Sequence, residues 1–302
     1  MNKLKYCFIV LFFSLSFLLA QNVFSDTTIN IYYTASLNGN LVGCDCKQVP
    51  KSGLESSAYF LRERNTDSSI LIDLGDFTDV WGDEPLAELL ISLYKGLDYD
   101  IIAPGEQEFT AGIHFFKKTR RKLPFLNNNM MIDGHRLSIN PYVISRKGVK
   151  IGVAAIVEPD VFYILPEAET SRLSFISVEN ASKDALRQLE ELDTDYKILL
   201  YHGSTASGER LFRSETGWDA VLLAHDQILK QEYIGQRVFA SPGEEGNRVG
   251  QLELVFRGSR LVKATNSFNI FSYKDSPKDD IVIAAFENYK KELIKNLKNG
   301  KK

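Results

Sequence analysis

Residues 69–76 read SILIDLGD, a short apolar run that ends in Gly75-Asp76. Apolar and β-branched residues bounded by turn residues are typical of a buried strand. A carboxylate at the end of such a strand is held at the edge of a sheet, where rigid neighbours can orient it toward a ligand. This stretch therefore predicts an α/β protein with a site at its strand ends.

Two histidines occupy the same kind of position as Asp76. His202 closes the run ILLYH at 198–202, and His225 closes VLLAH at 221–225. A single histidine in such a place is more often a hydrogen-bonded core or surface residue than a ligand. The chain has four histidines, however, and the other two lack this context. We therefore expect His202 and His225 to lie near Asp76.

Strand and helix patterns alternate along the whole chain, as in a mixed α/β domain with two packed sheets and outer helices. Helical spacing of apolar residues predicts helices at 54–64, 85–94, 182–192 and 279–299. Runs of β-branched and aromatic residues predict strands at 28–34, 69–74, 98–103, 123–127, 142–145, 149–157, 197–201, 220–223, 238–240, 249–256 and 261–271.

The first 25 residues carry the pattern of a signal peptide. Two lysines precede a nearly unbroken apolar stretch at 7–20, which is shorter than the ~20 apolar residues that a bilayer span needs. An uncleaved anchor is the alternative. We expect cleavage near Ser25 and Asp26, export to the periplasm or the extracellular space, and no transmembrane segment in the mature chain.

Composition indicates an ordinary globular protein, with 44% hydrophobic and 25% charged residues. The formal net charge of −3 becomes −5 once the two lysines of the signal peptide are removed, so nucleic acid is not an expected partner. We expect one domain at 26–278, followed by a C-terminal helix and basic tail at 279–302.

The last predicted helix has one apolar stripe, formed by residues 282, 286, 289, 293 and 297. Two uses fit such a stripe. It can pack against the protein's own domain, which is commoner, or it can offer a surface to a partner or a membrane.

Cys44 and Cys46 are the two cysteines beyond the signal peptide. In an exported protein they could form a disulfide, but one intervening residue makes a tight ring that is easily reduced. A reactive redox pair, a soft-metal site and two unpaired loop thiols are the alternatives.

Taken in order, the strand-end motifs resemble those in the N-terminal domain of exported bacterial 5′-nucleotidase-like proteins, of the calcineurin-like metallophosphoesterase superfamily. The family pattern runs Asp-x-His-Gly, Gly-Asp, Gly-Asn-His-Glu, a lone His, then Gly-His-x-His. The resemblance covers roughly residues 29–289. It implies a four-layer sandwich of two mixed β-sheets flanked by helices, with metals at the strand ends. The matching segments are 34–39, 75–76, 105–108, His202 and 225–227.

The resemblance implies that one ligand set survives. The family's second metal is held at positions that here are Asp76, Glu106, His202 and His225. Carboxylate and imidazole ligands suit zinc or manganese. We therefore expect at most one divalent transition-metal ion per chain, and the absence of any ion is the alternative.

The remaining family positions have lost their ligands. Ser36, Asn38 and Gln227 stand where the first metal is held, and none of them is a strong ligand for a transition metal. Gln107 replaces the catalytic His that stabilises the leaving group, whereas Glu108 keeps the closing Glu of that motif. We therefore assign no catalytic residue.

These substitutions disfavour efficient hydrolysis. Asp76 and Glu106 on one ion would give a formally neutral centre, which attracts phosphate less than a two-metal clamp does. Gln107 cannot donate a proton as His can. The chain also ends at the helix that in nucleotidases leads to a nucleobase-binding domain, so we expect no C-terminal nucleotide-binding domain and no nucleotide specificity.

Three hypotheses follow. The first is an exported pseudo-enzyme, a binding or structural protein whose ligand is an unknown small phosphorylated molecule or a protein. The second is a weak mononuclear metal-dependent phosphoesterase. The third is a redox or soft-metal role of Cys44 and Cys46.

Overall fold

The structure is a computed structural model that describes residues 25–45, 51–243 and 246–298. The predicted signal peptide, apart from Ser25, and Cys46 lie outside the described residues. None of the described helices combines the length and the apolarity that crossing a bilayer requires.

The first of two large sheets has five strands. Strands β1 (Thr27–Thr34), β2 (Ser69–Asp73) and β3 (Ile101–Ile102) run parallel, so their carboxyl ends lie at one edge. Antiparallel strands β13 (Arg248–Arg257) and β14 (Arg260–Ile270) complete the order β14-β13-β1-β2-β3. Every residue of β2 is buried, as expected for a parallel strand covered on both faces.

Six strands form the second sheet, with four parallel strands in the middle and an antiparallel strand at each edge. In order across the sheet they are β11 (Leu229–Ile234), β12 (Arg237–Pro242), β10 (Ala220–His225), β9 (Tyr196–Gly203), β7 (Val149–Val157) and β6 (Tyr142–Arg146).

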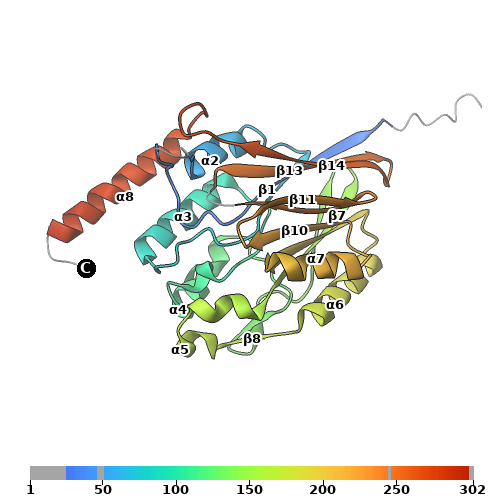
Figure 1. The fold of residues 1–302 in the computed structure, drawn as a ribbon, viewed down its shortest axis with the longest axis horizontal. Helices are drawn as coiled ribbons and strands as arrows, with labels where there is room; N and C mark the ends of the chain where they lie inside the picture. Colours follow the sequence, from blue (N-terminus) through green and yellow to red (C-terminus); the bar gives the residue numbers. More distant parts are fainter. Residues whose placement is uncertain (1–24, 46–50, 244–245, 299–302) are drawn as a thin grey trace, which may run out of the picture.

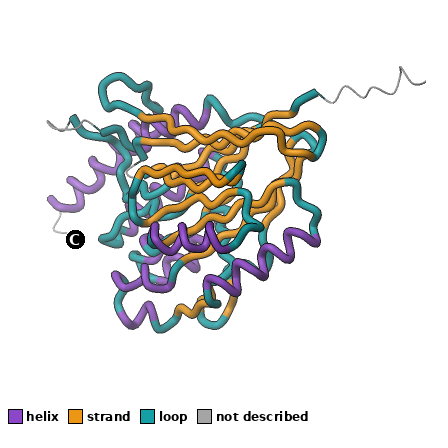
Figure 2. Tube along the Cα trace, turned by 45° about the vertical axis from the view of Figure 1, so that its right-hand side comes forward, coloured by secondary structure: helices purple, strands orange, loops and turns teal. Residues whose placement is uncertain are grey.

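Helices cover the outer faces of both sheets (Figures 1 and 2). Helices α2 (Leu54–Arg62), α3 (Glu84–Leu97) and α8 (Asp280–Lys298) pack on the five-stranded sheet. Helices α6 (Val178–Glu191) and α7 (Thr205–Ser214) pack on the six-stranded sheet. The shorter helices are α4 (Ile113–Thr119), α5 (Glu167–Thr170), η1 (Gln107–Phe109), η2 (Arg120–Lys122) and η3 (Pro159–Ile164).

The main core lies between the two large sheets. Ile31 of β1 and Leu200 of β9 are fully buried there, whereas Tyr32 belongs to the apolar cluster on the helix side of its sheet. Successive side chains of a strand point to opposite faces, so one sheet can bury both faces at once. Two mixed sheets between helix layers confirm the predicted fold class.

A third, small sheet was not predicted. It contains strands β5 (His135–Arg136), β4 (Met130–Ile132) and β8 (Leu173–Phe175) in the order β5-β4-β8. Strands of two or three residues are too short to show a periodic pattern, so the sequence carries no clear signal for them.

The predicted strand at 123–127 is wrong. In this segment only Phe125 forms an isolated bridge, with Ile102 of β3. Pro124 has no N–H to donate, which prevents a continuous ladder. The segment still lies along β3, because the Ile102 N–H donates to the Pro124 carbonyl and the Leu126 N–H donates to the Ile102 carbonyl.

Candidate metal centre

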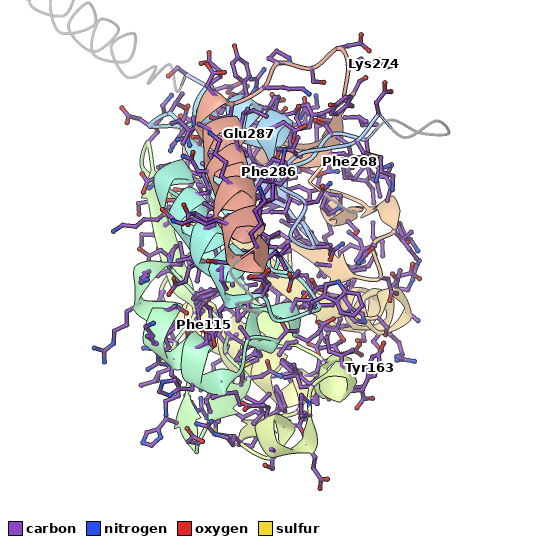
Figure 3. The ribbon with its side chains drawn as sticks, turned by 90° about the vertical axis from the view of Figure 1, so that its left-hand side faces the viewer. Phe115, Tyr163, Phe268, Lys274, Phe286 and Glu287 are labelled. Carbon is purple, nitrogen blue, oxygen red and sulfur yellow. The ribbon has the colours of Figure 1, made fainter. Side chains whose placement is uncertain are left out.

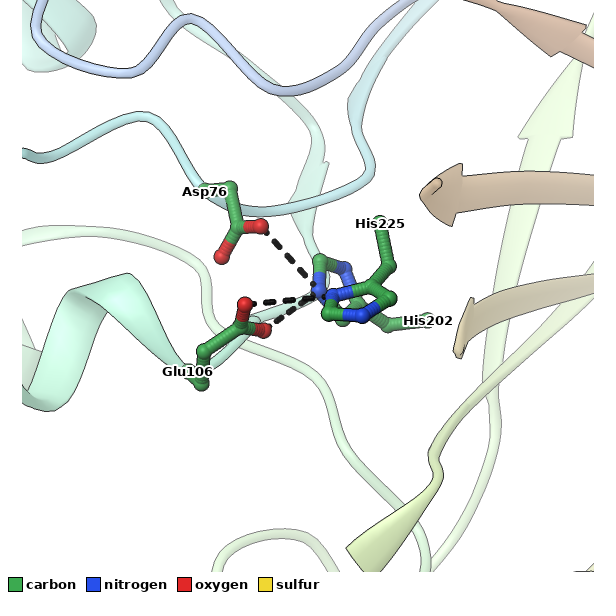
Figure 4. A group of neighbouring side chains, drawn as sticks. All are labelled: Asp76, Glu106, His202 and His225. Atoms are coloured by element: carbon green, nitrogen blue, oxygen red, sulfur yellow. Dashed lines mark hydrogen bonds and ion pairs between the residues drawn. The ribbon is translucent and has the colours of Figure 1, made fainter. Parts of the chain in front are cut away.

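Four side chains meet where the two large sheets present their strand ends (Figure 4). Asp76 follows β2, Glu106 lies between β3 and η1, His202 lies near the end of β9, and His225 is the last residue of β10. One potential ligand atom from each residue lies within 4.8 Å of all the others. The structure thus brings together all four residues of the predicted ligand set.

Glu106 joins the two histidines. Its Oε2 lies 2.9 Å from Nε2 of His202, and its Oε1 lies 3.1 Å from Nδ1 of His225. The Nε2 of His202 is also 3.3 Å from Oδ2 of Asp76. Asp76, Glu106 and His202 are buried, whereas 23% of the His225 side chain is exposed. His225 is therefore the ligand candidate nearest to solvent.

The main chain fixes the orientation of the His202 ring. Nδ1 of His202 lies 2.8 Å from the carbonyl oxygen of Leu74, so it carries a hydrogen and donates to that carbonyl. This leaves Nε2 on the side of the carboxylates. Metal-binding histidines are commonly oriented in this way by a hydrogen bond from their other ring nitrogen.

Two glycines allow the strand ends to approach each other. Gly75 has a φ of 95°, and Asp76 follows it in the left-handed region with a φ of 58°. A Cβ on Gly105 would lie 2.6 Å from Nε2 of His202 and closer still to Oδ1 of Asp76. Any side chain at Gly105 would therefore fill the space in which the ligand atoms converge.

Glu108 connects the loop that carries Asp76 to the loop that carries Gly105. Its Oε2 accepts the N–H groups of Asp76 and Gly105 at 3.0 and 2.7 Å. Its Oε1 accepts those of Phe77 and Thr78 at 2.8 and 3.3 Å. Burial and the neighbouring Asp76 carboxylate raise the pKa of Glu108, whereas these four donors favour its ionised form. Glu108 acts on the site by holding the loop of Asp76.

Charge is balanced inside the cluster. Burial opposes ionisation of Glu106, but hydrogen bonds from His202 and His225 outweigh it and lower the pKa of Glu106 to about 2. Burial also disfavours a charged His202, yet Asp76 and Glu106 raise the pKa of that imidazole well above its ordinary value. The hydrogen bond to Glu106 raises the pKa of His225. Glu106 and the two imidazoles thus favour each other's charged forms.

The donor set fits a divalent transition-metal ion. Two imidazole nitrogens and two carboxylates are a common ligand set for such ions, and the cluster is small enough for all four to contact one ion. A divalent ion bound by two carboxylates and two neutral imidazoles would leave the cluster formally neutral. It would supply Lewis-acid chemistry at this edge.

The positions without strong ligands form a cluster of their own beside Asp76. The side-chain amide of Gln107 donates to Oδ1 of Asn38 at 2.9 Å, and that of Gln227 approaches the same oxygen at 3.4 Å. We call Asn38, Gln107 and Gln227 the amide cluster. The Gln107 main-chain N–H also donates to Oδ1 of Asp76 at 3.1 Å. The amide cluster is thus joined to Asp76 through the main chain of Gln107.

The predicted Ser36 position lies at the same edge. Its main-chain N–H donates to the Gly75 carbonyl at 2.9 Å, and its hydroxyl is buried without a hydrogen-bond partner within the described part of the protein. Among the described residues, nine other than glycine have a positive φ, and five of these belong to this edge. The five are Ser36, Asn38, Asp76, His225 and Gln227. Such backbone strain concentrates at functional sites.

Cys44 is not part of this cluster. Cys44 forms a disulfide, so it is not a free thiol, and Cys46 lies outside the described residues. The N–H of Cys44 also donates to the carbonyl of Lys51 at 3.0 Å.

No family model matches the sequence, and comparison with curated proteins finds no match. Solved structures, however, share the fold. The calcineurin-like phosphoesterase YfkN of Bacillus subtilis has a TM-score of 0.72 at 16% identity, over 91% of this chain and 100% of that chain. The 5′-nucleotidase precursor of Thermus thermophilus has a TM-score of 0.72 at 16% identity, over 89% of this chain and 60% of that one. The fold is that of the metallophosphoesterases.

A third structure with this metallophosphoesterase fold is the sulfate thiohydrolase SoxB of Thermus thermophilus. Its TM-score is 0.73 at 15% identity, over 86% of this chain and 60% of that chain. The present chain therefore spans 60% of the length of both Thermus structures. The resemblance seen in the sequence is confirmed at the level of the fold.

Within the metallophosphoesterase fold, sequence reasoning missed the residues that support the site. The roles of Gly105 and Glu108 depend on contacts with segments far along the chain, although both belong to the motif at 105–108 that the sequence singled out. A second omission is Asp73, which is buried and accepts hydrogen bonds from Thr34 and Tyr94. Its position in SILIDLGD, inside an apolar run, was the available signal.

Proposed function

We propose that the protein binds one divalent transition-metal ion, zinc or manganese, through Asp76, Glu106, His202 and His225, and that it is a binding protein with little or no phosphoesterase activity. The amide cluster carries this proposal. The side-chain amides of Gln107 and Gln227 both donate to Asn38, so neutral side chains stand at the positions where a second ion would need anionic or imidazole ligands.

Electrostatics supports the same proposal. One ion with two carboxylates leaves no excess positive charge for a phosphate group. Gln107 has an amide that is already donated to Asn38, and it cannot act as a general acid. Loss of one electrostatic contribution to a transition state typically costs on the order of 10²–10³ in rate, so loss of two brings turnover close to background.

Export is a separate part of the proposal. The basic start, the apolar stretch at 7–20 and the residues near Ser25 support a cleaved signal peptide. The Thermus 5′-nucleotidase is likewise described as a precursor. N-terminal sequencing of protein recovered from an exporting host should begin at or near Asp26.

Metal content is the first test. Protein purified and then incubated with excess zinc or manganese should contain at most one ion per chain by mass spectrometry. His225→Ala should lose that ion, whereas His135→Ala, at an exposed histidine outside the cluster, should keep it. Two tightly bound ions in the unchanged protein would contradict the proposal.

Turnover is the second test, with 5′-nucleotides and a chromogenic phosphodiester as substrates. We expect rates near background with either metal. Robust turnover that disappears in Asp76→Asn would instead establish the mononuclear phosphoesterase, for which the intact four-residue cluster is the supporting observation. A gain of a second ion and of activity in the quadruple variant Ser36→Asp, Asn38→His, Gln107→His, Gln227→His would support the proposal directly.

A further inference from the structure

Helix α8 is supported by the domain over only part of its length. Val282 is fully buried, Phe286 packs against the cluster formed with α2 and α3, and the Tyr289 hydroxyl donates to Asp83 at 2.7 Å. Beyond these residues the helix extends past the domain, and every residue from 291 to 298 is exposed. Figure 1 shows this end of α8 at the margin of the molecule, and Figure 3 shows Phe286 midway along it.

The exposed end continues the apolar stripe of the supported part. Leu293, Ile294 and Leu297 are 42%, 50% and 65% exposed. Leu293 and Leu297 lie on the same side of the helix as Phe286, at intervals of seven and eleven residues. Helices shorter than about 12–15 residues are marginal in water without tertiary support, so these two turns would gain stability from a surface on which to lie.

The charge around this stripe is strongly positive. Residues 290–302 contain six lysines and one glutamate, a net charge of +5, so the rest of the chain carries −8 of the total of −3. Such a concentrated charge asymmetry indicates an anionic partner. Two copies of the same lysine-rich helix would repel each other, which disfavours self-association through this end.

The size of the apolar surface favours a membrane over a protein as the anionic partner. Three side chains over two turns offer far less area than the ~800 Å² per partner of a stable protein interface. A lipid surface needs no such area, because apolar side chains enter the acyl boundary while lysines contact the headgroups. We propose that the end of α8, residues 290–298, binds the surface of an anionic membrane. This inference is independent of the metal centre.

Vesicle co-sedimentation tests the proposal, with protein lacking residues 1–25 so that the apolar stretch at 7–20 cannot contribute. The protein should sediment with vesicles of phosphatidylcholine and phosphatidylglycerol and should not sediment with vesicles of phosphatidylcholine alone. Binding should weaken as salt rises. Equal sedimentation with both vesicle types, or with neither, would overturn the proposal.

Charge-matched variants locate the binding surface. Because each lysine near an anionic surface contributes about 1 kcal/mol, Lys291→Gln, Lys295→Gln and Lys298→Gln together should weaken partitioning on the order of 10²-fold. The control removes the same number of charges from exposed lysines elsewhere and should weaken partitioning much less. Its substitutions are Lys147→Gln, Lys183→Gln and Lys263→Gln. Equal weakening by both sets would refute a specific role for α8.

Apolar variants test insertion. Leu293→Gln with Leu297→Gln should weaken partitioning roughly tenfold or more, whereas Ile139→Gln with Ile270→Gln, at similarly exposed apolar positions, should not. Amide hydrogen exchange of residues 291–298 should slow when anionic vesicles are added. Sedimentation analysis gives the remaining outcome. If the protein did not bind vesicles but formed a dimer, and the Leu293→Gln, Leu297→Gln variant did not, the partner of this surface would be a second copy of the chain.

Discussion

The side-chain amide of Gln107 donates to Oδ1 of Asn38 at 2.9 Å across 69 residues of sequence. Both side chains are neutral, and each uses the other as a hydrogen-bond partner at the edge where Asp76 presents its carboxylate. Nε2 of His202 lies 3.3 Å from Oδ2 of the same Asp76 and 2.9 Å from Oε2 of Glu106. One carboxylate thus contacts both groups, through the Gln107 main-chain N–H and through Nε2 of His202.

Gly105→Ala should weaken metal binding and destabilise the fold by about 1–3 kcal/mol, because the new Cβ overlaps ligand atoms of Asp76 and His202. Isothermal titration with zinc and denaturant unfolding measure the two effects. In the control Gly96→Ala, within α3, the Cβ meets only the end of the Arg62 side chain at 3.9 Å. That variant should gain about 0.5–1 kcal/mol from helix propensity and bind metal unchanged. Undiminished binding by Gly105→Ala would place the ion elsewhere.

Glu108→Gln should destabilise the protein by about 1–3 kcal/mol and lower metal affinity. Each oxygen of Glu108 accepts two N–H groups, so an amide nitrogen faces two donors in either orientation. Thermal unfolding and metal titration report the two losses.

The matched control is Glu55→Gln, because Glu55 is also buried and accepts from Gly43, Ser52 and Gly53, none of which belongs to the four-residue cluster. It should be destabilised without any change in metal affinity. If both variants lost metal equally, the effect would be a consequence of lower stability alone.

The contribution of Glu106, His202 and His225 to the stability of the metal-free protein should be greatest between about pH 4.5 and 6.5. The lowered pKa of Glu106 gives stability that is present above its unfolded value and is lost as pH falls toward about 2. The raised pKa values of His202 and His225 give stability that is complete below the ordinary value of 6.5 and is lost as pH rises through the folded values. Denaturant unfolding with a chelator at several pH values measures this profile.

Metal should remove the loss of stability at high pH, because a histidine ligand must be neutral and the ion displaces its proton. Metal affinity should therefore rise with pH, with protons released on binding. His225→Gln should reduce the loss of stability of the metal-free protein above pH 6.5, whereas the exposed His135→Gln should leave that loss unchanged. A profile that is identical in all three proteins would show that His225 does not titrate in this way.

Cys44→Ser combined with Cys46→Ser should leave metal content and affinity unchanged, because Cys44 is disulfide-bonded and lies outside the four-residue cluster. Mass spectrometry of metal content and a thiol assay make the comparison. Loss of the ion in the double variant would favour the soft-metal role of the cysteines over the carboxylate and histidine site.

Local patterns in the sequence predicted the mixed α/β fold and singled out Asp76, His202 and His225, whereas Glu106 was predicted only from the resemblance to the metallophosphoesterases. His202 and His225 each end a buried apolar run, and parallel strands deliver their ends to one edge. The exposed strand β11 was missed because its residues LKQEYI lack a buried face. It is recognised as a strand only by its pairing with β12 in the structure. Strand β2, in contrast, is buried on both faces, so its residues SILID form a nearly continuous apolar run that predicts a strand.

The contacts within the site could not be predicted in the same way. Asn38 and Gln227 are 189 residues apart, and no local pattern indicates that they share a hydrogen bond with Gln107. The four N–H groups that converge on Glu108 come from two loops, whose approach depends on Gly75 and Gly105 lacking side chains. Such contacts follow from tertiary packing alone.

The left-handed backbone at Ser36, Asn38 and Gln227 makes this edge a scaffold for protein engineering. Aspartate, asparagine and histidine are enriched among residues in that conformation, so ligands of these types can be introduced there without rebuilding the loops. The strain of on the order of 1–3 kcal/mol per residue is already carried by the folded protein. New metal chemistry could thus be installed by exchanging side chains while the main chain stays as it is.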